Sequence, residues 1–183
     1  MTPSTITLFE VQEKIKSGLY IEASPINALK KDIYAFAEDF SMQLRDAFGE
    51  FNLWAIIEKL NGCIRIIDAA YWGQVSGSIF VDSRDNFEII LPSYTSPVRD
   101  NFTIAHELGH FMLHSEAGAK KIWAYRLGSG RLEWEANWFA ASLLMPKRII
   151  EQNNLFSQTP STLANFFQVS YEAAEIRLTN NGI

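Results

Sequence analysis

The sequence has a single cysteine and only three histidines among its 183 residues. With Cys63 alone, no disulfide can form within the chain, and a metal site built from several sulfur ligands is excluded. A chain without disulfides is typical of a reducing compartment, which favours the cytoplasm. Because Cys63 stands beside Ile64 in an apolar stretch, we expect it to be a small residue of the core.

Long apolar runs and an excess of basic side chains are also missing. The longest mainly apolar stretch, residues 138–145, is far too short to span a bilayer, and no basic flank leads into an apolar segment at the N-terminus. The formal net charge of -5 offers no general attraction to nucleic-acid backbones or anionic membranes. We therefore expect neither a membrane protein nor one exported by a signal peptide, and we expect its partners to be proteins or small molecules.

The chain is long enough, and at 48% hydrophobic residues apolar enough, for one globular domain with a substantial core. Apolar residues at steps of three and four predict helices, and short β-rich runs predict strands. The predicted helices span residues 28–48, which Gly49 ends, and 53–60; the predicted strands span 63–67, 78–81 and 87–91. These elements indicate an α+β fold, a single compact domain with a small mixed or antiparallel sheet.

All three histidines occur in FTIAHELGHFMLH, residues 102–114. This segment is apolar on nearly every side, and we expect a buried helix with Asp100 or Asn101 as its N-cap. Burial is costly for polar side chains, so those that the helix carries are informative.

His106 and His110 are four residues apart, so their imidazoles leave one face of a helix about 6 Å apart along its axis and can converge on one ion. Glu107 is rotated by about 100° from His106, where its carboxylate can meet a water beside that ion. This is the H-E-x-x-H zinc signature, and a catalytic zinc needs one more protein ligand and an open position. The alternative interpretation is a pair of hydrogen-bonded core histidines.

His114 is not expected to join the same ion. In an unbroken helix it lies about 12 Å along the axis from His106, whereas zinc ligands lie about 2 Å from the metal. The related pattern in which a later histidine returns to the metal requires glycine and histidine where Leu113 and Glu116 stand. We interpret His114 as a helix-end cation, a donor to a metal-binding residue, or a packed side chain.

The stretch RLEWEANWFAASLLMP, residues 131–146, supplies two carboxylates at the start of another apolar helix. Glu133 shares its face with Asn137 and Ala140, and the small residues there would let this helix lie close to the histidine helix. Asn137 could also hydrogen-bond to a zinc-bound histidine and orient it. We favour Glu133 over Glu135 as third ligand; for both, and more so for Glu135, the alternative is an exposed acid in a first helical turn.

Taken together, these two stretches resemble the ImmA/IrrE family of zinc metallopeptidases, whose members carry a similar histidine helix and then a Glu-x-x-Ala-Asn-x-Phe-Ala helix ending in Leu-Met-Pro. The resemblance covers about residues 53–146. It implies a zincin-like domain with Zn2+ held by His106, His110 and Glu133, and with Glu107 as general base. It also implies a cytoplasmic, bacterial or phage-borne enzyme that cleaves a transcriptional repressor, often encoded beside it on a mobile element.

Substrate binding has weaker signals. Tyr125 and Arg126, between the two motifs, are candidates to stabilise the tetrahedral intermediate. Residues 87–91 could bind an extended substrate along a strand edge, with an ordinary core strand as the alternative.

The second class of function is non-catalytic: a binding or regulatory module with a structural or vestigial metal site. Glu107 favours the enzyme, because a structural site needs no carboxylate beside its ligands.

The domain division that we expect is a metallopeptidase domain with N-terminal helices at residues 1–150 and a C-terminal helical extension at residues 151–183. The extension contains two short helical patterns that resemble a helix-turn-helix. A DNA-reading second helix should carry basic and amide side chains, whereas this one carries Glu172 and Glu175 against Arg177 alone. The pattern therefore argues against DNA binding and favours packing or partner docking.

Overall fold

A mixed β-sheet forms the centre of the computed structural model, which describes residues 3–68, 70, 77–93, 95–125 and 130–179. The strands are β1 (Ser4–Thr5), β2 (Ile21–Glu22), β3 (Gly62–Ile67), β4 (Ser78–Ser83), β5 (Asn86–Pro92) and β6 (Ile122–Tyr125). Within these described residues they form a six-stranded sheet in the order β1-β3-β5-β4-β6-β2. β4 is antiparallel to both of its neighbours, and the other pairs are parallel. The mixed sheet confirms the predicted α+β class.

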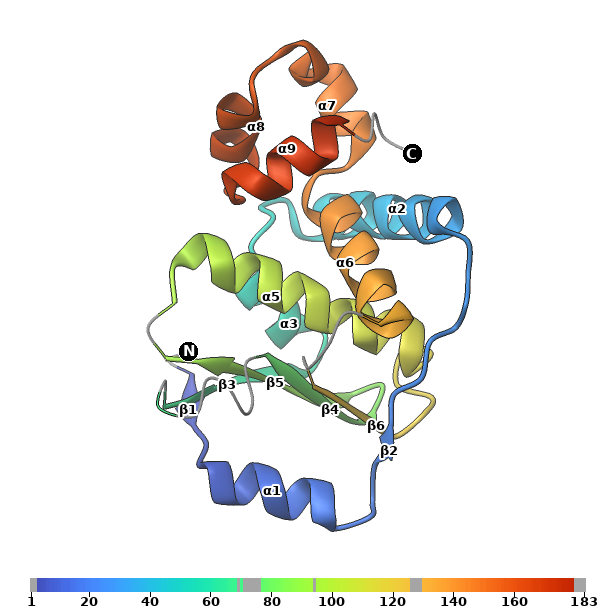
Figure 1. The fold of residues 1–183 in the computed structure, drawn as a ribbon, viewed down its shortest axis with the longest axis vertical. Coiled ribbons are helices and arrows are strands. Elements are labelled where there is room, and N and C mark those ends of the chain that lie inside the picture. Colours follow the sequence, from blue (N-terminus) through green and yellow to red (C-terminus); the bar gives the residue numbers. More distant parts are fainter. Residues whose placement is uncertain (1–2, 69, 71–76, 94, 126–129, 180–183) are drawn as a thin grey trace.

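Helices lie on both faces of this sheet (Figure 1). They are α1 (Leu8–Lys16), α2 (Lys30–Phe48), α3 (Leu53–Lys59), α5 (Pro97–Gly109) with the π-helical turn η2 (His110–His114), α6 (Arg131–Leu144), α7 (Lys147–Gln152), the 3-10 turn η3 (Leu155–Ser157), α8 (Pro160–Phe167) and α9 (Tyr171–Thr179). α1 covers one face, α3 and α5 cover the other, and α2 and α6 lie beyond α5. Among the described residues, no helix combines the length and apolar character needed to cross a lipid bilayer.

The helix predicted over residues 28–48 is α2, and Gly49 ends it with a φ of 74°, a conformation that glycine adopts without steric cost. Only some of its apolar side chains face the core. Ile33, Ala37 and Leu44 are buried, whereas Phe36 is 42% exposed. Periodicity thus located the helix, and packing against α6 selected the face.

The histidine helix begins earlier than the sequence indicated, and the prediction of Asp100 or Asn101 as its N-cap is wrong. Ser96 is the N-cap, with its Oγ accepting a hydrogen bond of 3.3 Å from the backbone N–H of Arg99. Pro97 occupies the first turn, where its missing N–H costs no hydrogen bond. The serine-proline pair therefore starts the helix one turn before the predicted site.

β5 is an interior strand, so the expectation that residues 87–91 offer an edge to a substrate is wrong. β5 pairs with β3 along one edge and with β4 along the other, so its backbone groups are used on both edges. The alternative of an ordinary core strand holds.

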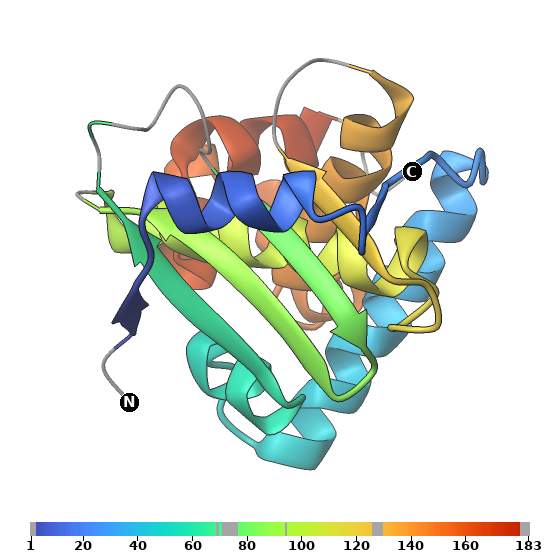
Figure 2. The same cartoon turned by 90° about the horizontal axis from the view of Figure 1, so that it is seen from below.

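Cys63 is exposed, so its prediction as a core residue is also wrong. Side chains alternate between the two faces of a strand, and Ile64 points into the larger core while Cys63 points to the α1 side. The beginning of β3 lies away from α1 on that face (Figure 2), so α1 does not cover it.

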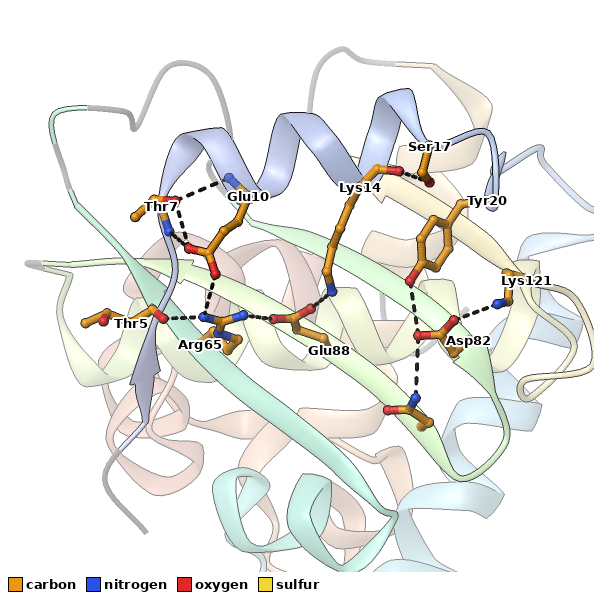
Figure 3. A network of polar contacts seen from close by, with 11 residues as sticks. Thr5, Thr7, Glu10, Lys14, Ser17, Tyr20, Arg65, Asp82, Glu88 and Lys121 are labelled. Atoms are coloured by element: carbon orange, nitrogen blue, oxygen red, sulfur yellow. Dashed lines mark hydrogen bonds and ion pairs between the residues drawn. The ribbon is translucent and has the colours of Figure 1, made fainter.

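A small second core and a polar network join α1 to the sheet. Ile6, Val11, Ile67, Phe80 and Ile90 form this core. Beside it, Glu88 accepts from Lys14 and, at 3.1 Å, from Arg65, while the Tyr20 hydroxyl donates to Asp82 at 3.1 Å (Figure 3). α1 therefore stabilises the face of the sheet opposite the histidine helix.

The C-terminal helices pack against the rest of the chain. Ile150, Leu163 and Ala174 belong to the same hydrophobic cluster as α5 and α6. The Arg177 side chain is buried: its Nε donates to the carbonyl of Met145 at 3.0 Å, and its guanidinium lies 5.3 Å from the ring centroid of Tyr34. The lone basic residue of α9 is thus a packing residue, turned away from solvent.

Candidate metal centre

Two helices that cross above the sheet supply the polar residues of the site. α5 and its π-helical continuation carry His106, Glu107 and His110, which are buried to 0%, 1% and 1% relative exposure. α6 carries Glu133, which is 6% exposed. Glu133 and the two histidines, which are 23 or more positions apart in sequence, therefore meet where little water reaches them. An unpaired charge would be costly there.

The imidazole and carboxylate groups converge on one point. His106 Nε2 lies 3.1 Å from His110 Nε2 and 3.2 Å from one oxygen of Glu133, and His110 Nε2 lies 3.6 Å from the other oxygen. One ligand atom from each of the three residues lies within 4.8 Å of the others. A tetrahedral zinc with bonds of about 2.0–2.1 Å would separate its ligand atoms by about 3.3 Å. The donor set and its spacing fit such an ion.

Asn137 lies one turn after Glu133 on α6 and faces His106. Its Oδ1 is 2.9 Å from His106 Nδ1. Because an amide oxygen only accepts, Nδ1 carries the hydrogen and leaves the Nε2 lone pair directed at the convergence point. This is the contact that the sequence predicted for Asn137.

His114 contacts His110 on the far side from that point. The two Nδ1 atoms are 2.9 Å apart, and His114 Nε2 lies 3.1 Å from Glu135 Oε2. Burial lowers the pKa of His114, although the Glu135 carboxylate opposes the shift. The lowered pKa of His114 argues against a helix-end cation, and its burial and its contact with His110 agree with a packed, hydrogen-bonded side chain.

Glu135 is fully buried, so its interpretation as an exposed acid is wrong. Burial raises its pKa, but hydrogen bonds from Arg131, the Ile26 N–H and His114 outweigh that effect and hold the pKa below its usual value. Arg131 Nε and the Ile26 N–H both donate at 2.9 Å. Periodicity could not reveal this role, because Ile26 is 109 residues away in sequence; the Arg131 to Glu135 spacing of four was the one local signal.

The two candidates for stabilising a tetrahedral intermediate stay predictions. Tyr125 is the last residue of β6, opposite Ser78 of β4. Arg126 lies outside the described residues.

A cavity of about 760 Å³ opens beside Asn137, between α5, α6 and α9. Its walls include Arg99, Phe102 and Thr103 from α5 and Trp134 from α6. Trp134 is 50% exposed and adds an aromatic surface to this cavity, which reaches the site through Asn137.

Comparison with known proteins agrees with this geometry. The sequence model of the Peptidase_M78 family, described as the IrrE N-terminal-like domain, matches residues 72–179, more than half of the chain. The chain belongs to the ImmA/IrrE family of metallopeptidases. This ImmA/IrrE match includes both α5 and α6, and it runs through the C-terminal helices α8 and α9.

A relative of this ImmA/IrrE protein is the uncharacterized immunity region protein 2 of Bacillus phage phi105. The two are 30% identical over 104 residues, which is 56% of this chain and 63% of the phage protein. The chain thus matches less than two thirds of that relative's length.

Proposed function

We propose that this protein is a zinc-dependent endopeptidase of the cytoplasm that cleaves a regulatory protein, such as a helix-turn-helix transcriptional repressor. The observation that carries the proposal is the convergence of His106, His110 and Glu133 on one point. Glu107 is buried beside them, on the same helix as His106. Family membership supports the peptidase chemistry. The family resemblance and the immunity-region relative support a regulatory substrate.

His106, His110 and Glu133 are the residues that would hold the ion. Bound there, zinc would supply Lewis-acid activation of a water and of the scissile carbonyl. The chain supplies the proton chemistry: the Glu107 carboxylate takes a proton from the attacking water and passes it to the departing amine. Asn137 holds the His106 ring in the orientation that this requires.

A peptide could approach along the cavity beside Asn137. The aromatic side chains Phe102 and Trp134 and the Arg99 guanidinium line it. These walls offer apolar contact together with one basic side chain, Arg99, and one acidic side chain, Glu172.

Glu107→Gln tests the proposal. The amide keeps the size of the side chain but cannot accept the proton, so we expect cleavage to fall about 100-fold or more while zinc content and folding stay close to wild type. Both proteins, loaded with zinc, should be incubated with a helix-turn-helix repressor from the same genome, chosen first from the neighbouring genes, and the fragments followed by mass spectrometry. Casein is unsuitable as the sole substrate, because a selective peptidase can ignore it.

Each outcome of that experiment separates the two function classes. Equal cleavage by wild type and Glu107→Gln would remove Glu107 from the mechanism. Cleavage by neither would favour the alternative of a non-catalytic binding module with a structural metal site.

The division of the chain at residue 150 is also a proposal, with residues 151–183 as a helical extension that docks a partner. Glu172 and Glu175 are exposed on α9 while Arg177 is buried, a distribution that supports a protein partner over DNA.

A further inference from the structure

A line of polar contacts leads from His110 through His114 to Glu135, away from the convergence point of the proposed ligands. The distances are 2.9 Å between the two Nδ1 atoms and 3.1 Å between His114 Nε2 and Glu135 Oε2. The side chains of His114 and Glu135 are 0% exposed. Buried polar groups at these distances constrain one another, because water cannot replace a lost partner.

The hydrogens in this line can be placed from both ends. Glu135 is a carboxylate and only accepts, so His114 Nε2 must carry a hydrogen and donate it. His110 faces the other proposed ligands with Nε2, so a ring that holds the ion there carries its hydrogen on Nδ1, and His114 Nδ1 is the acceptor 2.9 Å away. His110 Nδ1 must therefore donate to it, and the lone pair of His110 lies on Nε2. That nitrogen is the one facing His106 and Glu133.

The far end of the line is fixed to two other parts of the chain. Glu135 accepts from Arg131 Nε within α6 and from the backbone N–H of Ile26, each at 2.9 Å. The near end lies in the π-helical turn η2, where the Ser115 N–H donates to the carbonyl of His110 at 3.0 Å. π-helical turns are rare and occur frequently at functional sites.

We propose that His114 and Glu135 are positioning residues that hold His110 in the tautomer and ring orientation that can bind the metal. The inference rests on the proposed metal site. It assigns to His114 and Glu135 the role for His110 that Asn137 has for His106, so that each imidazole has its own support on the side away from the ion. Loss of such a support typically weakens metal binding about 10–100-fold.

His114→Phe is the decisive variant, because it keeps an aromatic ring and removes the acceptor nitrogen. Zinc affinity, measured by competition with a chelator, should fall about 10–100-fold. In the metal-free protein, nitrogen-15 NMR of the histidine rings at pH 8 should show the Nδ1–H tautomer of His110 in wild type and a mixture of tautomers in the variant. His114→Gln offers both an acceptor and a donor, and it should restore part of the affinity.

Ser142→Ala is the matched control, because Ser142 is fully buried on the same helix as Glu135 and takes no part in the line. It should leave zinc affinity and the His110 tautomer unchanged. If His114→Phe does not fold, Glu135→Gln replaces it: the amide can turn its NH2 toward His114, so it should also weaken zinc binding and mix the His110 tautomers.

His106→Ala separates failure of this inference from failure of the proposed site. If wild type binds zinc no better than His106→Ala, the metal site itself is wrong. If His106→Ala loses zinc while a folded His114→Phe or Glu135→Gln keeps wild-type affinity and a single His110 tautomer, the site stands and the positioning role is overturned.

Discussion

Gly109 lies directly against Ala136 where α5 crosses α6. A Cβ atom on Gly109 would be 3.2 Å from both the Cα and the carbonyl oxygen of Ala136, and 3.2 Å from the ring of Phe139. The missing side chain lets the two backbones approach, and this approach brings Glu133 to the histidines. The glycine inside the H-E-x-x-H stretch thus has a packing role in the site.

Gly109→Val should weaken both the fold and the metal site. Overpacking of a tight contact costs about 1–3 kcal/mol, and displacement of α6 would draw Glu133 away from His106. Gly109→Ala should be nearly neutral in stability, because the gain of about 1 kcal/mol in helix propensity offsets a smaller clash. Urea unfolding and zinc titration measure the two effects. Gly130→Ala, where a Cβ would meet no atom within 4 Å, is the control for zinc binding; unchanged zinc affinity in Gly109→Val would contradict the packing role.

Zinc stoichiometry should identify the ligands. We expect one zinc per chain in wild type, and loss of that ion in His106→Ala, His110→Ala and Glu133→Ala, because each removes one of three protein ligands. At saturating zinc, Glu135→Ala should still hold one ion, since Glu135 contacts His114 instead of the convergence point. Elemental analysis of the purified proteins measures this. A variant series in which Glu135→Ala empties the site and Glu133→Ala does not would reverse the assignment.

Arg177→Leu should destabilise the protein without changing zinc binding. The substitution leaves the carbonyl of Met145 without the hydrogen bond from Arg177, and burying such a group unpaired costs about 1–3 kcal/mol. Urea unfolding measures the change in unfolding free energy, with Glu175→Gln on the exposed side of α9 as control.

The same proteins test DNA binding by α9. A mobility-shift titration with duplex DNA should show no binding by Arg177→Leu, by Glu175→Gln or by wild type. A DNA complex that Arg177→Leu abolished would instead return α9 to the role of a reading helix.

The Tyr20 hydroxyl should make stability depend on pH in the alkaline range. Burial, together with the hydrogen bond to Asp82, raises the pKa of Tyr20 from 10.0 to about 12. A pKa raised in the folded state means that this contribution is fully present below about pH 10 and is lost as the pH rises toward about 12. The difference in unfolding free energy between wild type and Tyr20→Phe should therefore shrink from pH 9 to pH 11. Tyr171→Phe at an exposed tyrosine is the control for loss of a hydroxyl, and a difference for Tyr20 that stayed constant over this range would contradict the assignment.

The spacing of residues within one helix could be predicted from the sequence because helix geometry is local. Any two residues four positions apart lie on the same face of a helix. His106 and His110 form one such pair, and Glu133 and Asn137 form another. The chain pattern therefore indicated both sets of residues, and the structure brings the two sets together at 3.2 Å and 2.9 Å. The amphipathic helix before Gly49 and the hairpin of β4 and β5 were predictable on the same local grounds.

The sequence by itself determined which residue types stand at helical and strand spacing, and so the signature of the metal site. Tertiary structure decided what these elements pack against. Strand order placed β5 in the interior of the sheet, and the extent of α1 left Cys63 exposed. The hydrogen bond from Ile26 to Glu135 joins residues 109 positions apart. Such contacts depend on how separate elements pack together, and no periodicity along the chain records that arrangement.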